Sequence, residues 1–181
     1  MPNWCYSGVR VEGPKDKVRK LYHMMKNLEE MKEPLLENGF GLTWYGNLVH
    51  ILGEDWQKIY CRGLWTFLYV EDTVLAWDDE TAWGPLTEIF QLIEEKIPGL
   101  KVYYSSEEDG MGIYQTNDWT GKYFPARYIL QTDCDRDYYK TIEEVMQAAS
   151  NQLNHSITTR EQLETAIEDH DDWALHEIQV V

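Results

Sequence analysis

Alternating hydrophobic and polar positions predict that the chain begins directly with a strand and a helix. In residues 5–11 every second side chain is small or apolar, which is the two-residue period of a strand with one buried face. In residues 18–28 the apolar side chains return at steps of three and four, as they do along one face of a helix. Two runs rich in aromatic and branched residues, 64–70 and 73–77, then predict a β-hairpin around Glu71-Asp72.

The stretch TAWGPLTEIFQLIEEKIPG predicts a second helix, because Pro85 suits a first turn and Pro98-Gly99 ends the apolar stripe. Strands are predicted at 100–105 and 112–116, with a further one at 123–131. The resulting order, β-α-β-β-α-β, is that of the ferredoxin-like split βαβ arrangement. This is an α+β fold in which two helices cover one face of an antiparallel sheet.

The remainder of the chain predicts a C-terminal helix-helix-strand extension. The two helices open with capping boxes, Thr141 with Glu144 and Thr158 with Glu161, and residues 174–180 alternate like a strand. The sequence therefore divides into a ferredoxin-like domain, 1–132, and an acidic extension, 133–181, packed on it. Within the domain, glycines break residues 35–63 into an irregular excursion that contains a short strand or a turn of helix.

Net charge is the strongest compositional feature. The chain has 32 acidic and 16 basic residues, a formal charge of −16 at pH 7. The imbalance grows along the chain, from +1 over residues 1–40 to −8 over 41–132 and −9 over 133–181. An acidic protein repels nucleic-acid phosphates, so we expect no direct nucleic-acid binding, and cationic proteins or metal ions are the partners that this field attracts. Solubility alone is the simpler explanation of the same charge.

The cysteines and the apolar runs predict a cytoplasmic protein. Cys5, Cys61 and Cys134 are odd in number and form no CxxC pair, which is typical of buried cysteines in a reducing compartment. Cys5 lies on the apolar face of the first predicted strand, so we interpret it as an inert core residue. No charged segment followed by an apolar run occurs near the start, and no apolar run is long enough for a membrane span.

The opening MPNWCYSGVRVEGP resembles the start of the YubB-type ferredoxin-like domain family of phages and conjugative plasmids. TAWGPL before the second helix and VYYSSEEDGMG in the following hairpin are also similar to that family. The chain departs from the family pattern at Ser7, where Asn is usual, and at Leu86, where Pro is usual. The resemblance implies a ferredoxin-like fold and a mobile-element context, and it implies no catalytic residues.

One acidic segment matches the spacing of an EF-hand calcium loop. Counting from Asp133, carboxylates fall at positions one, three, five and twelve, namely Asp133, Asp135, Asp137 and Glu144. The sixth position, where the loop needs glycine, is Tyr138, and a strand rather than a helix is predicted before the segment. The alternative is that Glu144 only caps the next helix. Calcium is therefore the secondary hypothesis, and no other cofactor is expected.

A second acidic pattern lies in the last predicted helix. Glu161, Glu164, Glu168 and Asp172 recur at steps of three and four, which would place them in one stripe. Neighbours in such a stripe are separated by about 5–6 Å, comparable with successive phosphates of a DNA strand. A protein from a mobile element could use this stripe to occupy the DNA site of a host factor. The alternative is a solvated helix face.

Large aromatic residues in predicted loops offer another binding surface. They are Trp44, Tyr45, Trp56 and Trp119, which could equally close over the core. No nucleophile or phosphate-binding motif and no HxxxH or HExxH metal-ligand spacing is present, and we interpret Asp78-Asp79-Glu80 as a solvated strand end. The sequence thus predicts a non-enzymatic acidic module that binds a protein, either a basic or a DNA-binding factor, with no membrane partner.

Overall fold

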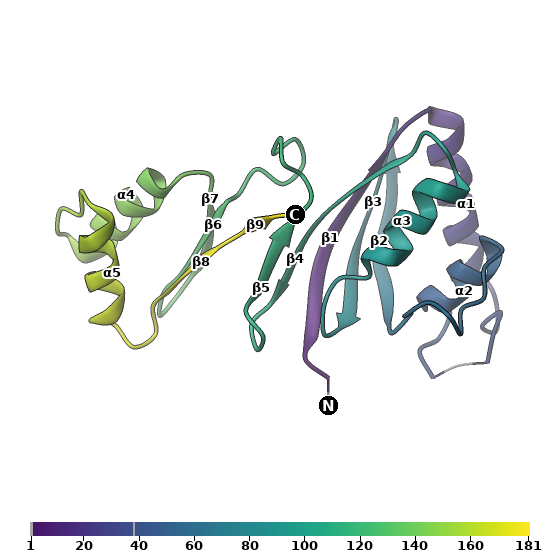
Figure 1. The fold of residues 1–181 in the computed structure, drawn as a ribbon, viewed down its shortest axis with the longest axis horizontal. Coiled ribbons are helices and arrows are strands. Elements are labelled where there is room, and N and C mark those ends of the chain that lie inside the picture. Colours follow the sequence, from purple (N-terminus) through teal and green to yellow (C-terminus); the bar gives the residue numbers. More distant parts are fainter. Residues whose placement is uncertain (1, 38) are drawn as a thin grey trace. The chain divides into compact units, whose positions relative to one another are not determined.

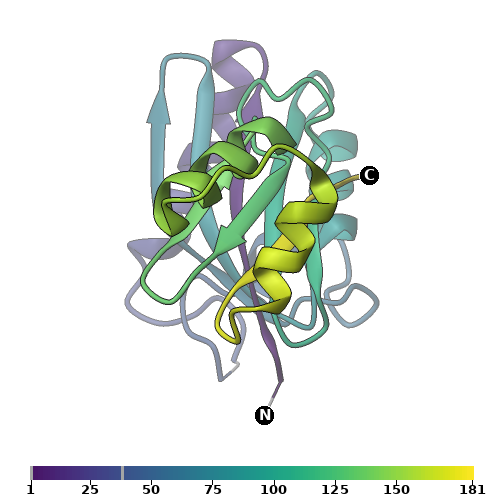
Figure 2. The same cartoon turned by 90° about the vertical axis from the view of Figure 1, so that its left-hand side faces the viewer.

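The computed structural model describes residues 2–37 and 39–181 and has a mixed α+β fold with antiparallel sheets. The chain forms two compact units, unit 1 (residues 1–113) and unit 2 (residues 114–181). Figure 1 shows the elements of both units in chain order, and Figure 2 gives the view at right angles. The division falls before Tyr114, whereas the sequence pattern divided the chain at 132.

Four antiparallel strands make the sheet of unit 1, in the order β2-β3-β1-β4. The strand β1 (Trp4–Glu12) pairs with β3 (Val74–Ala82) on one side and with β4 (Lys101–Glu108) on the other. The strand β2 (Gly63–Glu71) extends the sheet beyond β3. The alternation predicted for the opening strand is confirmed, because its inward side chains Cys5, Val9 and Val11 have no exposed surface.

The helices α1 (Lys15–Glu29) and α3 (Thr87–Lys96) lie on the same face of this sheet (Figure 1). The apolar stripe of α1 is buried as its period predicts, through Val18, Leu21, Met25 and Leu28. These side chains join one core with Trp65 and Trp77 of the sheet. In the part of the chain that the structure describes, no helix has the length and apolar character needed to cross a bilayer.

The excursion at 35–63 contains a third helix, α2 (Tyr45–Ile51), which also packs into the core of unit 1. Asn47 is fully buried and ties the preceding segment to this helix. Its amide nitrogen donates to the carbonyls of Gly41 and Leu42 at 3.2 and 3.0 Å, and its side-chain oxygen accepts from Leu36 N at 3.1 Å. The irregular backbone therefore has hydrogen-bond partners that replace a strand or helix.

Unit 2 is built on a three-stranded antiparallel sheet in the order β7-β6-β8. Its strands are β7 (Arg136–Tyr139), β6 (Tyr128–Gln131) and β8 (Ala174–Glu177). The helices α4 (Ile142–Leu153) and α5 (Arg160–Glu168) pack a second core around Leu130, Val145 and Leu163. The single final strand predicted from sequence is divided, because β9 (Gln179–Val180) leaves β8 and pairs in parallel with β5 (Ile113–Thr116).

The capping box of α4 forms as predicted from Thr141 and Glu144. The box of α5 is shifted by one residue from the prediction: Thr159 caps the helix, and Gln162 replaces Glu161 as its partner. Glu161 therefore takes no part in the capping box, and its side chain is exposed in the first turn of α5.

Candidate protein-binding surfaces

The segment from Thr141 to Val181 carries nine acidic residues and one arginine, with no lysine. All nine carboxylate residues are exposed, on α4, on α5, in the turn that follows α5 and at the end of β8. They are Glu143, Glu144, Glu161, Glu164, Glu168, Asp169, Asp171, Asp172 and Glu177. So many uncompensated charges in one compact unit create a strong negative potential over its surface.

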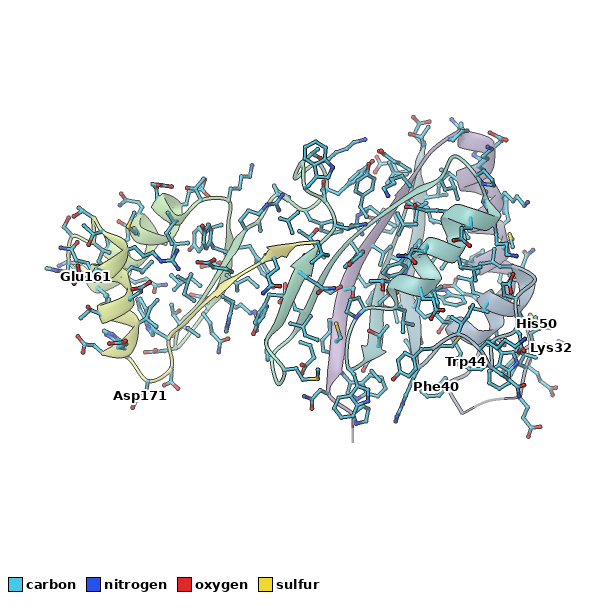
Figure 3. The ribbon with its side chains drawn as sticks, in the orientation of Figure 1. Lys32, Phe40, Trp44, His50, Glu161 and Asp171 are labelled. Atoms are coloured by element: carbon cyan, nitrogen blue, oxygen red, sulfur yellow. The ribbon has the colours of Figure 1, made fainter. Side chains whose placement is uncertain are left out.

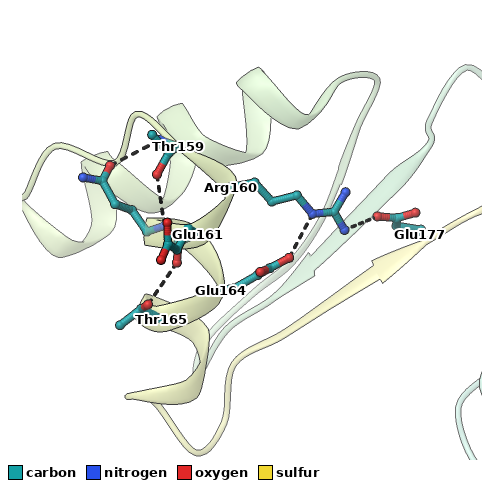
Figure 4. Close-up of polar contacts among 7 residues, drawn as sticks. Thr159, Arg160, Glu161, Glu164, Thr165 and Glu177 are labelled. Carbon is teal, nitrogen blue, oxygen red and sulfur yellow. Dashed lines mark hydrogen bonds and ion pairs between the residues drawn. The ribbon is translucent and has the colours of Figure 1, made fainter.

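The four acids of the predicted stripe do not share one helix. The helix α5 ends at Glu168 with Asp169 as its C-cap, so Asp172 lies in the turn beyond it. Arg160 Nε contacts Glu164 at 2.9 Å, and its Nη2 contacts Glu177 at 2.5 Å (Figure 4). The only arginine of the segment therefore compensates Glu164 and Glu177, and the other carboxylates of α5 and its turn have no cation beside them among the described ion pairs.

Glu161 takes no part in this ion pair and lines an open hollow of about 390 Å³. We call it the α5 hollow; it lies between α5 and the loop after α4. Its lining residues are Leu153, His155, Ile157, Glu161, Gln162, Thr165, Ala166, Asp169 and His170. Figure 3 shows Glu161 near the start of α5 and Asp171 in the turn after it.

The chain reversal after α4 shapes this hollow. Asn154 adopts a left-handed conformation with φ of 49°, which asparagine tolerates better than most residues, and ends α4 there. The hydroxyl of Ser150 then accepts a hydrogen bond from Ile157 N at 2.9 Å and holds the returning chain. On the opposite wall His170 is fixed through Nδ1, which lies 2.7 Å from the carbonyl of Ala166.

A second hollow of about 330 Å³ adjoins the first, since both are lined by Leu153 and His170. Its other lining residues are Thr132, Asp133, Cys134, Gln152 and Trp173. Asp133 was predicted as a calcium ligand and instead lines this hollow. Neither hollow could be found in the sequence, because each is lined by residues from segments that are distant along the chain.

The structure does not assemble the predicted calcium loop. The carboxylate of Glu144 accepts hydrogen bonds from Lys140 N at 2.7 Å and Thr141 N at 3.4 Å, as the capping alternative requires. Asp137 lies within β7, where the extended backbone cannot wrap around an ion. Among the described residues, no group of three or more Asp, Glu, His or Cys side chains is arranged to hold a metal, so the structure does not bring Asp133, Asp135, Asp137 and Glu144 together as one ligand set.

Of the four aromatic candidates, only Trp119 is fully presented to solvent. Its side chain is 77% exposed, whereas Trp44 and Tyr45 are buried and Trp56 packs against the core of unit 1. Trp44 and Trp56 meet edge to face with their ring centroids 5.1 Å apart. The alternative that these residues close over the core therefore holds for three of them.

The loop that carries Trp119 is organised by its neighbour Asp118. The carboxylate of Asp118, which is fully buried, accepts hydrogen bonds from Tyr123 N at 2.6 Å, Phe124 N at 2.9 Å and Thr120 Oγ1 at 2.9 Å. Burial raises the pKa of Asp118, but these hydrogen bonds outweigh burial and lower the pKa below its ordinary value. Arg127 closes the loop by donating to the carbonyls of Asp118 and Phe124 at 2.8 Å.

Asp79 is not the solvated strand-end residue that the sequence suggested, because it is 2% exposed. Its Oδ1 accepts hydrogen bonds from the hydroxyl of Tyr45 and from Trp77 Nε1, the latter at 2.7 Å. Its Oδ2 is buried without a hydrogen-bond partner among the described residues. Burial raises the pKa of Asp79 to about 7, against the opposing effect of the two hydrogen bonds. Sequence reasoning missed this group because α2, which supplies Tyr45, is distant in sequence.

Cys5 matches its prediction as an inert core residue. It has no exposed surface, and burial raises the pKa of its thiol to about 11. Its partner on β3, Thr81, and its neighbour on the same face of β1, Ser7, are also buried. Cys5 and the polar side chains beside it, Ser7 and Thr81, are therefore all closed from solvent.

No protein-family model, no curated protein and no solved structure matches this chain.

Proposed function

We propose that the protein is a non-enzymatic, acidic binding module whose partner is a basic or DNA-binding protein. The observation that carries the proposal is the exposure of nine carboxylates against one arginine in residues 141–181. Such a surface attracts a cationic partner over the range of the screened field, roughly 8–10 Å at ordinary ionic strength. It repels nucleic acid itself.

The proposed mode of action is mimicry of nucleic-acid phosphates. In this proposal the acidic surface of unit 2 occupies the site that the partner uses for a phosphate backbone. Glu164 contributes little because Arg160 neutralises it, so the effective carboxylates are Glu161, Glu168 and the acids of the following turn. Lysine and arginine side chains that release counterions from DNA would contact these carboxylates instead.

We also propose that unit 1 has the ferredoxin-like arrangement. A ferredoxin-like arrangement of unit 1 is supported by the strand order β2-β3-β1-β4 and by two crossover helices on one face of the sheet. The opening MPNWCYSGVRVEGP supports membership of the YubB-type family of mobile elements. In such a context a host factor that acts on incoming DNA is a fitting target for a phosphate mimic.

The test is affinity capture from a bacterial lysate at low and at high salt, with and without competing duplex DNA. A DNA-binding protein retained at low salt and released by either salt or DNA is the expected result, because both compete for the same cationic side chains. The neutralised variant Glu161→Gln, Glu168→Gln, Asp171→Asn, Asp172→Asn should no longer retain it.

A matched control removes four charges elsewhere, as Glu30→Gln, Glu33→Gln, Glu37→Gln and Glu95→Gln on the exposed surface of unit 1. This variant has the same net charge as the neutralised one and should retain the partner. Equal loss of binding in both variants would show that net charge alone is responsible. A partner indifferent to salt and to DNA would refute mimicry.

A further inference from the structure

The α5 hollow combines an apolar floor with an acidic edge. Ile157 is buried, and Leu153 and Ala166 are half-buried, so these three form the floor. Glu161 and Asp169 are exposed and stand at the edge. No lysine or arginine is present among the described residues that line the hollow.

We infer that the α5 hollow is a binding site for an arginine side chain of the basic partner. The inference rests on the proposed function and names the contact that would anchor the partner. A long cationic side chain lays its methylene groups on apolar surface and keeps its charged end beside water and carboxylates. The α5 hollow offers these two environments side by side.

Arginine fits the acidic edge better than lysine does. Its planar guanidinium has five N–H donors, is less strongly hydrated than an ammonium group and can form two parallel hydrogen bonds with one carboxylate. Glu161 and Asp169 line the same hollow from α5 and its C-cap, about 12 Å apart along the helix axis, so the guanidinium pairs with one of them while the other adds to the negative potential of the hollow. The other carboxylates of α5, Glu164 and Glu168, do not line it.

The adjoining hollow extends the site along the partner chain. Since the two hollows share Leu153 and His170, a peptide that places one side chain in the α5 hollow can continue over the second. Asp133 lines the second hollow and supplies a further negative charge there. The ring of Trp173, 9% exposed, and the side chain of Gln152 line the rest. The occupant is thus a segment with alternating basic and apolar side chains.

The probe for this inference is the peptide acetyl-Leu-Arg-Leu-Arg-Leu-amide, titrated into the full chain and followed by NMR. The Ala166 methyl and the His170 ring should shift saturably. The same peptide with citrulline for arginine keeps the shape and loses the charge, and it should bind at least about tenfold more weakly. A lysine version should fall between the two.

Two double variants remove the same number of charges from one helix. Glu161→Gln with Asp169→Asn should weaken peptide binding about tenfold, whereas Glu164→Gln with Glu168→Gln should change it by less than about twofold. Thr165→Phe, which covers the hollow without changing its charge, should abolish the shifts. Circular dichroism of each variant verifies that the helices remain.

Equal weakening by both double variants would mean diffuse attraction and would overturn the arginine site, while leaving the proposed function standing. A second result would have the same consequence: the wild-type signals do not shift on adding the peptide, although the lysate experiment retains a partner that salt and DNA release. The arginine site would then be overturned, and the proposed function would stand. If that capture also fails, the proposed function fails with it. Binding of the citrulline peptide as tightly as the arginine peptide would likewise overturn the inference.

Discussion

At the scale of single residues, acidic side chains that are adjacent in the sequence differ in burial. Asp78, Asp79 and Glu80 are consecutive acids, yet only Asp79 faces the core, because side chains of a strand alternate between its two faces. The strand period could have shown this, since Leu75, Trp77 and Asp79 share a face. What the period could not supply was Tyr45, which reaches Asp79 from α2.

Asp79 should make the stability of the protein pH-dependent. Its folded pKa is raised from 3.8 to about 7, so the folded state binds more protons than the unfolded state between these values. The free energy of unfolding therefore falls as pH rises from about 4 to about 7 and is constant above that, as far as Asp79 is concerned. Asp79→Asn keeps the hydrogen-bond acceptor and removes this slope.

We expect Asp79→Asn to unfold at the same urea concentration as wild type at pH 4 and to be more stable than wild type by about 4 kcal/mol at pH 8, because a shift of about three pKa units corresponds to that free energy. Urea denaturation of both proteins at the two pH values is the measurement. Their difference isolates Asp79 from the other titrating groups. A variant less stable than wild type at pH 8 would show that the buried carboxylate is stabilising.

Asp118 and Trp119 are adjacent and should behave in opposite ways. Asp118→Ala removes the buried carboxylate that accepts from the half-buried N–H groups of Tyr123 and Phe124 and should cost about 2–3 kcal/mol of unfolding free energy. Trp119→Ala removes an exposed ring and should change it by less than about 0.5 kcal/mol. Urea denaturation measures both, and hydrogen exchange at the amides of residues 123 and 124 should accelerate only in Asp118→Ala. Similar losses in the two variants would contradict the description of this loop.

At the scale of elements, the hydrophobic periods predicted most helices and strands, but they did not predict α2. The stripes of α1 and α3 and the alternation of β1 were legible because each buries one side against the core. The helix α2 was hidden, since it is short and its five innermost residues, Tyr45 to Val49, include Gly46 and Asn47. Gly46 is needed there because a Cβ atom would lie 2.2 Å from the Trp44 ring.

The capping of α5 gives a test at the same scale. Thr159 is the N-cap and accepts from Gln162 N at 3.2 Å, whereas Thr158 only donates to the exposed side chain of Gln162. Thr159→Ala should therefore cost about 1 kcal/mol of unfolding free energy, and Thr158→Ala much less. Urea denaturation of the two variants compares them directly. The reverse order would restore the box of Thr158 and Glu161 that the sequence suggested.

At the scale of the whole molecule, composition predicted that the net charge is negative, but it did not predict which carboxylates are free of a neighbouring cation. Unit 2 holds 13 acidic and five basic residues, and unit 1 holds 19 and 11, so both have a net charge of −8 although unit 2 is much shorter. The position of the few basic residues decides which carboxylates are available to a partner. Arg160 removes Glu164 from that set through a pair within α5, and it removes Glu177 because β8 brings that residue beside α5.

The central claim is that the acidic surface of unit 2 replaces nucleic acid on a basic protein. The most direct measurement uses the captured partner bound to a fluorescent duplex DNA and titrates in this protein while anisotropy is followed. The account predicts that wild type and the unit 1 control displace the DNA and that the neutralised variant of residues 161, 168, 171 and 172 does not. A ternary complex, in which the partner holds the DNA and this protein together, would contradict it.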